Sequence, residues 1–151
     1  MYSARVEKLM GRLEEEGLDA LLVTSLPNAY YLSGFTGSTA MLLLTNGRKW
    51  FITDSRYHEQ VEQEVDASYE LFDNTNKKLA EDVLPALPGQ ELLKRIGFES
   101  EHVSHSLYSK MAEADGREFI STSGWIEDLR VVKDKDEIER IRQAVLLNEK
   151  V

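Results

Sequence analysis

Apolar residues recur along the chain with the two periods that distinguish amphipathic helices from buried strands. Residues 6–13 follow the i, i+3, i+4, i+7 spacing of a helix, and Gly17 is its predicted end. The next apolar run, at residues 19–24, is too short for a helix and predicts a buried strand. This succession of helix, turn and strand predicts an α/β fold.

An antiparallel hairpin is predicted next. Apolar runs at residues 40–45 and 49–53 flank Asn46 and Gly47. An Asn-Gly pair readily supplies the two positive φ angles of a type I′ turn. The sequence therefore predicts two neighbouring strands joined by such a turn.

Asp54 directly follows the second strand of this hairpin. An aspartate in that place accepts a hydrogen bond from the first amides of a helix, so Asp54 is a predicted N-cap. Tyr57, Val61 and Val65 mark one face of the helix that follows.

The rest of the chain continues the alternation of strands and helices. A short helical turn is expected after Pro27, at residues 28–32, and a loop at 33–38. The later predicted strands lie at residues 68–72, 96–98 and 118–122. The later predicted helices cover residues 79–87, 104–111 and 125–129. Ser104 is the predicted N-cap of the second of these helices, which should stop at the Asp115-Gly116 turn.

Asp134 and Glu137 have the spacing of a capping box at the start of a last helix. Its apolar pattern continues to Val151 without a Gly, Pro or polar stop. We therefore expect the chain to be the front domain of a longer polypeptide.

The composition narrows the classes of partner. The sequence has 18 Lys and Arg against 27 Asp and Glu, a net charge of -9, which argues against nucleic acid and membrane surfaces. It has no cysteine, which removes disulfides, thiol nucleophiles and Cys-based zinc sites. Charged residues interrupt every short apolar run near the N-terminus, so no signal peptide is predicted, and we expect a cytoplasmic location.

The residues that suggest metal or phosphate chemistry lack the patterns that such sites need. His102 and His105 are three residues apart, but no third ligand accompanies them, so we interpret them as the polar start of a helix. His58 is interpreted as a surface residue. The Gly-rich stretch at 34–38 lacks the spacing of a phosphate loop.

Nucleophilic and acid-base chemistry are equally unsupported. A nucleophile needs a neighbouring base and an oxyanion hole, and no G-x-S-x-G motif surrounds the three serines of the central stretch, Ser33, Ser38 and Ser55. Asp54 with Glu59 or Asp66 is better explained by a cap and a charged helix face. The residues alone therefore predict no active site.

Three separated motifs resemble a known family. They are N-A-Y-Y-L-S-G-F-T-G-S at residues 28–38, I-T-D-S-R-Y at 52–57, and L-R-V-V-K-D-K-D-E-I-E-R-I-R-Q-A at 129–144. In this order and spacing they resemble the N-terminal domain of the creatinase/prolidase family, the Xaa-Pro aminopeptidases and dipeptidases. The resemblance covers nearly the whole chain.

The resemblance implies a ribonuclease-H-like α/β fold, a mixed sheet of about six strands with an antiparallel hairpin and flanking helices. It implies a domain at residues 1–131 and a linker helix at 132–151 that leads to a separate "pita-bread" catalytic domain. In such enzymes two divalent metal ions, commonly manganese or cobalt, activate water in that catalytic domain. No catalytic, cofactor or metal residue is therefore assigned to this chain.

The resemblance also implies a task for the central loop. In the family this domain mediates dimer or tetramer contacts and walls the active-site entrance, where proline-containing peptides pass. The corresponding residues here are Tyr31, Gly34, Phe35, Thr36, Gly37 and Ser38. We expect the stretch from Phe35 to Ser38 to be the tip of the loop and the best candidate to touch a substrate. Phe35→Ala is then expected to raise the KM for peptides with little loss of stability.

A second matched motif comprises Asp54, Arg56 and Tyr57, for which we favour a structural role as cap, ion pair and packing residues. Some dipeptidase relatives carry Asp or His in the central loop. This loop carries neither, which favours aminopeptidase-like substrates.

Two hypotheses of different class remain. The first is a non-catalytic domain of a metal-dependent Xaa-Pro peptidase. The alternative is a binding module without chemistry, or the domain of a creatinase-like amidinohydrolase that acts on a small non-peptide. The residues that follow Val151 in the parent protein would discriminate between them.

Overall fold

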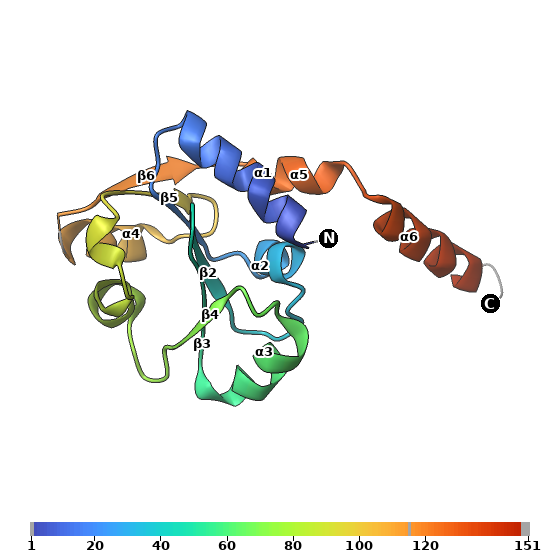
Figure 1. Ribbon diagram of the computed structural model, residues 1–151, viewed down its shortest axis with the longest axis horizontal. Coiled ribbons are helices and arrows are strands. Elements are labelled where there is room, and N and C mark those ends of the chain that lie inside the picture. The colour runs from blue at the N-terminus through green and yellow to red at the C-terminus, as the bar shows by residue number, and fades with distance from the viewer. Residues whose placement is uncertain (1, 115, 149–151) are drawn as a thin grey trace.

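The apolar runs form one mixed six-stranded sheet in the computed structural model, which describes residues 2–114 and 116–148 (Figure 1). The strand order is β4-β3-β2-β1-β5-β6, and only β2 runs antiparallel to its neighbours. The strands are β1 (Ala20–Val23), β2 (Met41–Thr45), β3 (Lys49–Thr53), β4 (Glu70–Asp73), β5 (Arg95–Glu99) and β6 (Glu118–Thr122). The expected mixed sheet with an antiparallel hairpin is confirmed.

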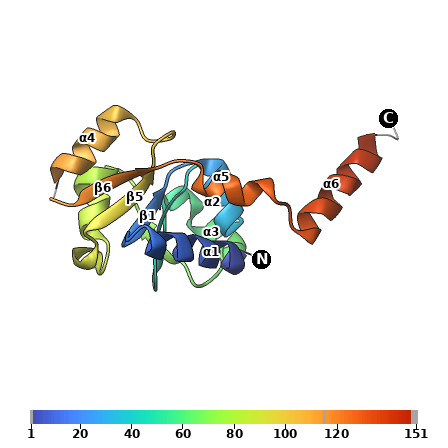
Figure 2. The same cartoon turned by 90° about the horizontal axis from the view of Figure 1, so that it is seen from above.

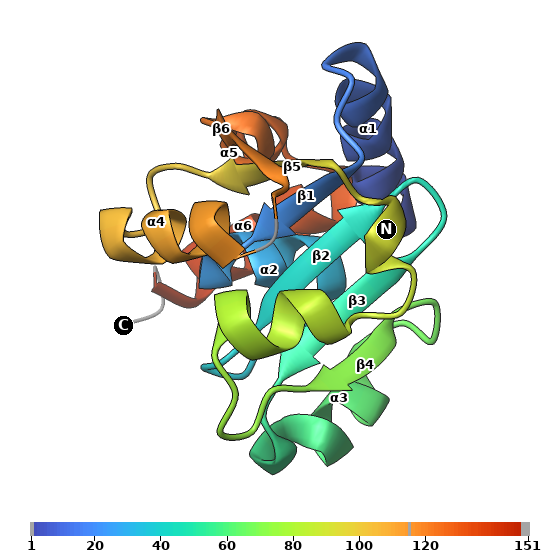
Figure 3. The same cartoon turned by 90° about the vertical axis from the view of Figure 1, so that its left-hand side faces the viewer.

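Helices cover both faces of the sheet. They are α1 (Tyr2–Glu15), α2 (Leu26–Ser33), α3 (His58–Glu64), α4 (His105–Ala114), α5 (Trp125–Val131) and α6 (Lys135–Asn148). The apolar cluster on one face receives side chains from α1, α2, α3 and α5. The cluster on the other face receives them from α4 and from the turns at residues 79–86. Figure 3 shows α4 and those turns in front of the sheet.

The alternation of side chains along the strands explains why the central runs look uniformly apolar. Leu21 and Val23 of β1 belong to one apolar cluster, and Ala20 and Leu22 belong to the other. All four are fully buried. A strand covered on both faces needs apolar residues at every position, so it loses the alternating pattern of a half-exposed strand.

The hairpin between β2 and β3 is confirmed, but its predicted turn type is wrong. The register pairs Leu44 with Lys49, so the two strands are joined by a short turn around Asn46 and Gly47, as the sequence predicts. A type I′ turn needs positive φ at Asn46 and Gly47, and among these two only Gly47 has it, at 142°. The Gly47 amide instead donates to the carbonyl of Thr45 at 2.9 Å, and the Thr45 hydroxyl donates to the carbonyl of Arg48 at 2.9 Å.

Several element boundaries differ from the prediction. β4 is Glu70–Asp73, shifted from the expected 68–72. The expected helix at 79–87 consists of a π-helical turn (Leu79–Val83) and a 3₁₀ turn (Leu84–Ala86), because Pro85 lacks the amide that a continuous helix would use. α2 begins before residue 28, with Pro27 in its first turn. The expected stop of α4 at Asp115 lies outside the described residues.

α6 extends away from the body of the domain (Figures 1 and 2). Its described residues include none that is buried. The capping box predicted at its start is present: Glu137 N donates to Asp134 Oδ1 and Asp134 N donates to Glu137 Oε2, both at 2.9 Å. Among the described helices none is long and apolar enough to cross a membrane.

The observed turn makes a prediction that a type I′ turn would not. Asn46→Ala should change the free energy of unfolding by no more than about 0.5 kcal/mol, because Asn46 does not occupy the left-handed region. Gly47→Ala should cost about 1–2 kcal/mol, because a Cβ is strained at its φ. Urea unfolding of both variants measures the difference, and equal losses would contradict this turn geometry.

Candidate functional site

The loop that joins α2 to β2 begins at Gly34, where the chain leaves the helix. Gly34 adopts a left-handed conformation with φ of 84°, and its amide donates to the carbonyl of Tyr30. A Cβ at this position would lie 2.8 Å from the Tyr2 ring. Glycine is therefore favoured at this helix end, because another residue would be strained at this φ and its Cβ would displace the Tyr2 ring.

Phe35 is not an exposed loop tip, and the sequence-based expectation for it is wrong. The residue is only 2% exposed. Its ring meets those of Phe51 and Tyr57 edge to face, at centroid distances of 4.9 and 5.6 Å. Gly37 lies against the same ring, since a Cβ there would come within 2.3 Å of Phe35 Cζ. The loop thus folds over an aromatic anchor that belongs to the core.

Thr36 and Ser38 are the exposed residues of the loop, and they are held by α3 and by the 3₁₀ turn Ser55–Tyr57 that precedes it. The amide and hydroxyl of Thr36 donate to the Glu64 carboxylate at 2.7 and 2.8 Å. The hydrogen bond from the Thr36 amide lowers the pKa of Glu64 below its ordinary value. The Ser38 and Tyr57 hydroxyls are 2.6 Å apart. The loop therefore presents two small polar side chains in a defined conformation.

Asp54 forms the cap expected of it, on the 3₁₀ turn Ser55–Tyr57 that precedes α3. Its Oδ1 accepts from the Arg56 amide at 3.1 Å, and the Arg56 guanidinium binds both carboxylate oxygens at 2.8 and 2.9 Å. The hydrogen bond from the Arg56 side chain lowers the pKa of Asp54. Each oxygen of Asp54 is engaged by Arg56, which is a local structural pairing.

Tyr31, which sequence reasoning placed at the base of the loop, points elsewhere. Its ring packs beneath the Arg5 guanidinium, with 4.0 Å from the guanidinium carbon to the ring centroid. Its hydroxyl donates to the carbonyl of Leu129 at 3.0 Å. Burial raises the pKa of the Tyr31 hydroxyl above its ordinary value. Tyr31 thus lines an open groove between α1, α2 and the start of α6, away from Thr36 and Ser38.

A polar network that sequence reasoning missed lies where β1 and β5 end. Glu99 closes β5, and its Oε2 accepts from the amides of Thr24 and Ser25 at 2.6 and 2.8 Å. Its Oε1 accepts from Asn28 Nδ2 at 2.6 Å. Two signals were present in the sequence: an acidic residue that ends an apolar strand, and an Asn in the first turns of an apolar helix.

Asn28 connects this network to α5. It is fully buried. It donates to Glu127 Oε1 at 2.5 Å and accepts from Arg130 Nη1 at 2.9 Å. Burial acts to raise the pKa of Glu127, but hydrogen bonds from Asn28 and from the backbone, with the charge of Arg130, outweigh it and leave the pKa lowered.

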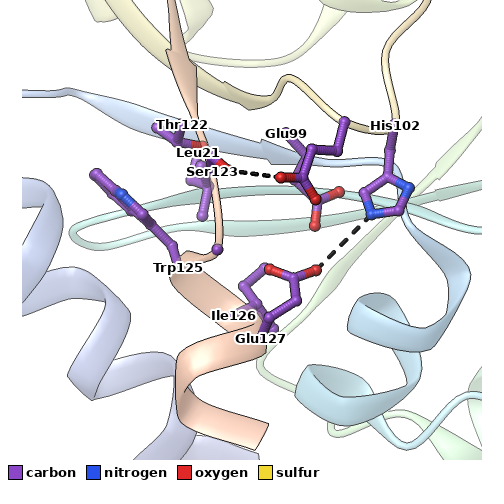
Figure 4. Close-up of a pocket in the computed structure, with 10 residues that line it drawn as sticks. Leu21, Glu99, His102, Thr122, Ser123, Trp125, Ile126 and Glu127 are labelled. Atoms are coloured by element: carbon purple, nitrogen blue, oxygen red, sulfur yellow. Dashed lines mark hydrogen bonds and ion pairs between the residues drawn. The ribbon is translucent and has the colours of Figure 1, made fainter.

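The small cavity beside this network is drawn in Figure 4. His102 Nε2 lies 3.8 Å from Glu127 Oε1, and Ser123 donates to Glu101 at 2.7 Å. The cavity measures about 10 Å³, room for one water molecule and too little for a substrate. The network therefore ties the ends of strands to a helix and offers no reaction chamber.

His102 and His105 do not join in a site. His105 opens α4, whose Leu107 amide donates to the Ser104 hydroxyl at 3.1 Å, the cap that the sequence predicts. Among residues 2–114 and 116–148 no cluster of three or more His, Asp or Glu side chains is arranged to hold a metal ion. The described residues thus supply no ligand set for the metal pair, which the family resemblance places in a separate catalytic domain.

The burial of Phe35 predicts a large stability effect. Phe35→Ala should lower the free energy of unfolding by about 3–5 kcal/mol, because it empties the space between Phe51 and Tyr57. Tyr30→Ala is the control, a neighbouring aromatic that is 45% exposed, and should cost less than about 1 kcal/mol. Urea unfolding compares them, and a small loss for Phe35→Ala would contradict the buried position.

Comparison with known proteins places these features in a family. The sequence is similar to the "Uncharacterized peptidase YqhT" of Bacillus subtilis (strain 168), with 29% identity over 143 residues, 93% of this chain and 39% of the relative. The structure is similar to an Xaa-Pro dipeptidase from Bacillus anthracis, with a TM-score of 0.82 and 32% identity over 92% of this chain and 38% of that one.

An X-Pro aminopeptidase from Thermotoga maritima MSB8 is also similar in structure, with a TM-score of 0.83 and 36% identity over 96% of this chain and 41% of that one. The chain thus spans about two fifths of the length of these relatives. The model of the creatinase/prolidase N-terminal domain matches residues 5–132. The resemblance found in the three sequence motifs is confirmed, and the chain belongs to the creatinase/prolidase N-terminal domain family.

Proposed function

We propose that this chain is the non-catalytic N-terminal domain of a metal-dependent Xaa-Pro peptidase. The observation that carries the proposal is the family match over residues 5–132 in a chain that spans about two fifths of its relatives. In this proposal a separate catalytic domain holds two divalent metal ions and hydrolyses the bond that precedes proline. The residues described here contribute binding surfaces.

The proposed first partner is that catalytic domain. Several apolar side chains of α6 are at least 40% exposed: Ile138, Ile141, Val145, Leu146 and Leu147. The relatives are more than twice as long as this chain, so polypeptide is available to cover them in a longer parent protein. This supports the proposed division into a domain at residues 1–131 and a linker helix at 132–151.

The second proposed task is to wall the active-site entrance and to contribute contacts between subunits. Because Phe35 is buried, the residues available for contact with a proline-containing peptide or a second subunit are Thr36 and Ser38. Their hydrogen bonds to Glu64 and Tyr57 hold the loop without a bound peptide. A preorganised wall of this kind loses little conformational entropy when a substrate passes it.

The full-length protein tests the catalytic assignment. With the sequence beyond Val151 restored and manganese supplied, it should hydrolyse Xaa-Pro peptides, whereas the 151-residue chain should not. Chelation followed by addition of metal should abolish and restore the activity. A folded, metal-loaded parent without Xaa-Pro hydrolysis would refute the proposal, and hydrolysis of a small non-peptide amidine substrate instead would favour the amidinohydrolase alternative.

A bulky residue in the loop tests the entrance role. In the full-length protein Ser38→Trp should raise the KM for peptide substrates about tenfold with little change in kcat, because it obstructs approach and leaves the reacting groups in place. Ser106→Trp, at an exposed position of α4, is the matched control. Steady-state kinetics measure both, and a Ser38→Trp variant with the parent's KM would remove the entrance role while leaving the catalytic assignment intact.

A further inference from the structure

Arg5, in the first turns of α1, is a charged residue that the fold buries. Its side chain is 10% exposed. Its guanidinium lies over the Tyr31 ring, and Nη1 donates to the backbone carbonyl of Tyr31 at 2.8 Å. A buried guanidinium is tolerated only where its charge and N–H groups find partners. The partners of Arg5 therefore indicate what it does.

The charged partners are the two residues that open α6. Arg5 Nη2 donates to Asp134 Oδ2 at 2.7 Å and lies 3.1 Å from Glu137 Oε1. The capping box uses the other two oxygens, Asp134 Oδ1 and Glu137 Oε2. Each carboxylate thus gives one oxygen to the cap of α6 and one to Arg5. The hydrogen bonds from the Glu137 amide and from Arg5 lower the pKa of Asp134, which favours its charged form.

α6 has little else to hold it. None of its described residues is buried. Within the described part of the chain, the hydrogen bonds and ion pairs that connect α6 and its cap residue Asp134 to the domain body run to Arg5. The last residue of α5, Val131, and the first residue of the connecting segment, Val132, are both exposed. Neither packing nor the connecting segment therefore fixes the direction of this helix.

We propose that the ion pairs of Arg5 with Asp134 and Glu137 set the direction in which α6 leaves the domain. Without the guanidinium, Asp134 and Glu137 can still cap the helix, so α6 should remain helical. Its orientation relative to the sheet, however, would become an ensemble. The assignment concerns residues of this chain alone and does not depend on the proposed peptidase activity.

A distance measurement in this chain tests whether Arg5 orients α6. The sequence has no cysteine, so spin labels can be attached at Glu62→Cys in α3 and Ala144→Cys in α6, both exposed positions. Pulsed electron spin resonance should give one narrow distribution of label distances in the parent sequence. With Arg5→Met the distribution should broaden by about twofold or more, while circular dichroism shows unchanged helix content.

Arg12→Met is the matched control on the same helix. Arg12 lies over the Trp125 ring at 4.8 Å and pairs with Asp128 at 3.4 Å, and it does not contact α6. Its variant should keep the narrow distribution. An unchanged distribution in Arg5→Met, or equal broadening in both variants, would overturn the proposal.

A second variant tests the same proposal if Arg5→Met does not fold. Asp134→Asn combined with Glu137→Gln keeps oxygen acceptors for the cap and removes both negative charges that face Arg5. The proposal requires this variant to broaden the distribution as well. A narrow distribution in the folded double variant would show that something other than the ion cluster directs α6.

Discussion

The central strands must be covered on both faces, and this constraint arranges the rest of the domain. β1, β2 and β3 send alternate side chains into two apolar clusters, so neither face of the sheet can be left to solvent. α1 and α2 close one face, and α4 with the irregular turns at 79–86 closes the other. Phe35 is drawn into the first cluster by Phe51, which is why the Gly-rich loop folds inward.

Polar groups are consequently gathered where the strands end. The amides of Thr24 and Ser25 follow β1 and have no strand partner there, and the Glu99 carboxylate satisfies both. Asn28 then extends the network to Glu127 and Arg130. A buried carboxylate costs free energy unless such donors surround it. The network therefore satisfies the buried polar groups at the strand ends, and the hydrogen bonds that join Asn28 to Glu127 and Arg130 hold α5 beside α2.

The sequence was sufficient for what depends on neighbouring residues. Hydrophobic periodicity located the helices and strands, and the caps at Asp54, Ser104 and Asp134 were correctly predicted because capping is a local interaction. The sequence did not predict the position of a side chain that depends on a partner far away in the chain. The burial of Phe35 depends on another strand, and Arg5 meets Asp134 across 129 residues. Hydrophobic periodicity is a local signal and does not indicate which distant residues will contact one another.

The ion cluster around Arg5 is better understood as an orienting device than as a source of stability. Taking the Arg5 guanidinium, and part of the Asp134 and Glu137 carboxylates, out of water costs nearly as much as their attraction returns, so such clusters add little net stability. Their value lies in geometry, because a guanidinium binds its partners in fixed directions. α6 exposes apolar residues and buries none of its described ones, so apolar burial does little to fix its direction. A polar contact at its first turn fixes its direction while leaving those apolar side chains open.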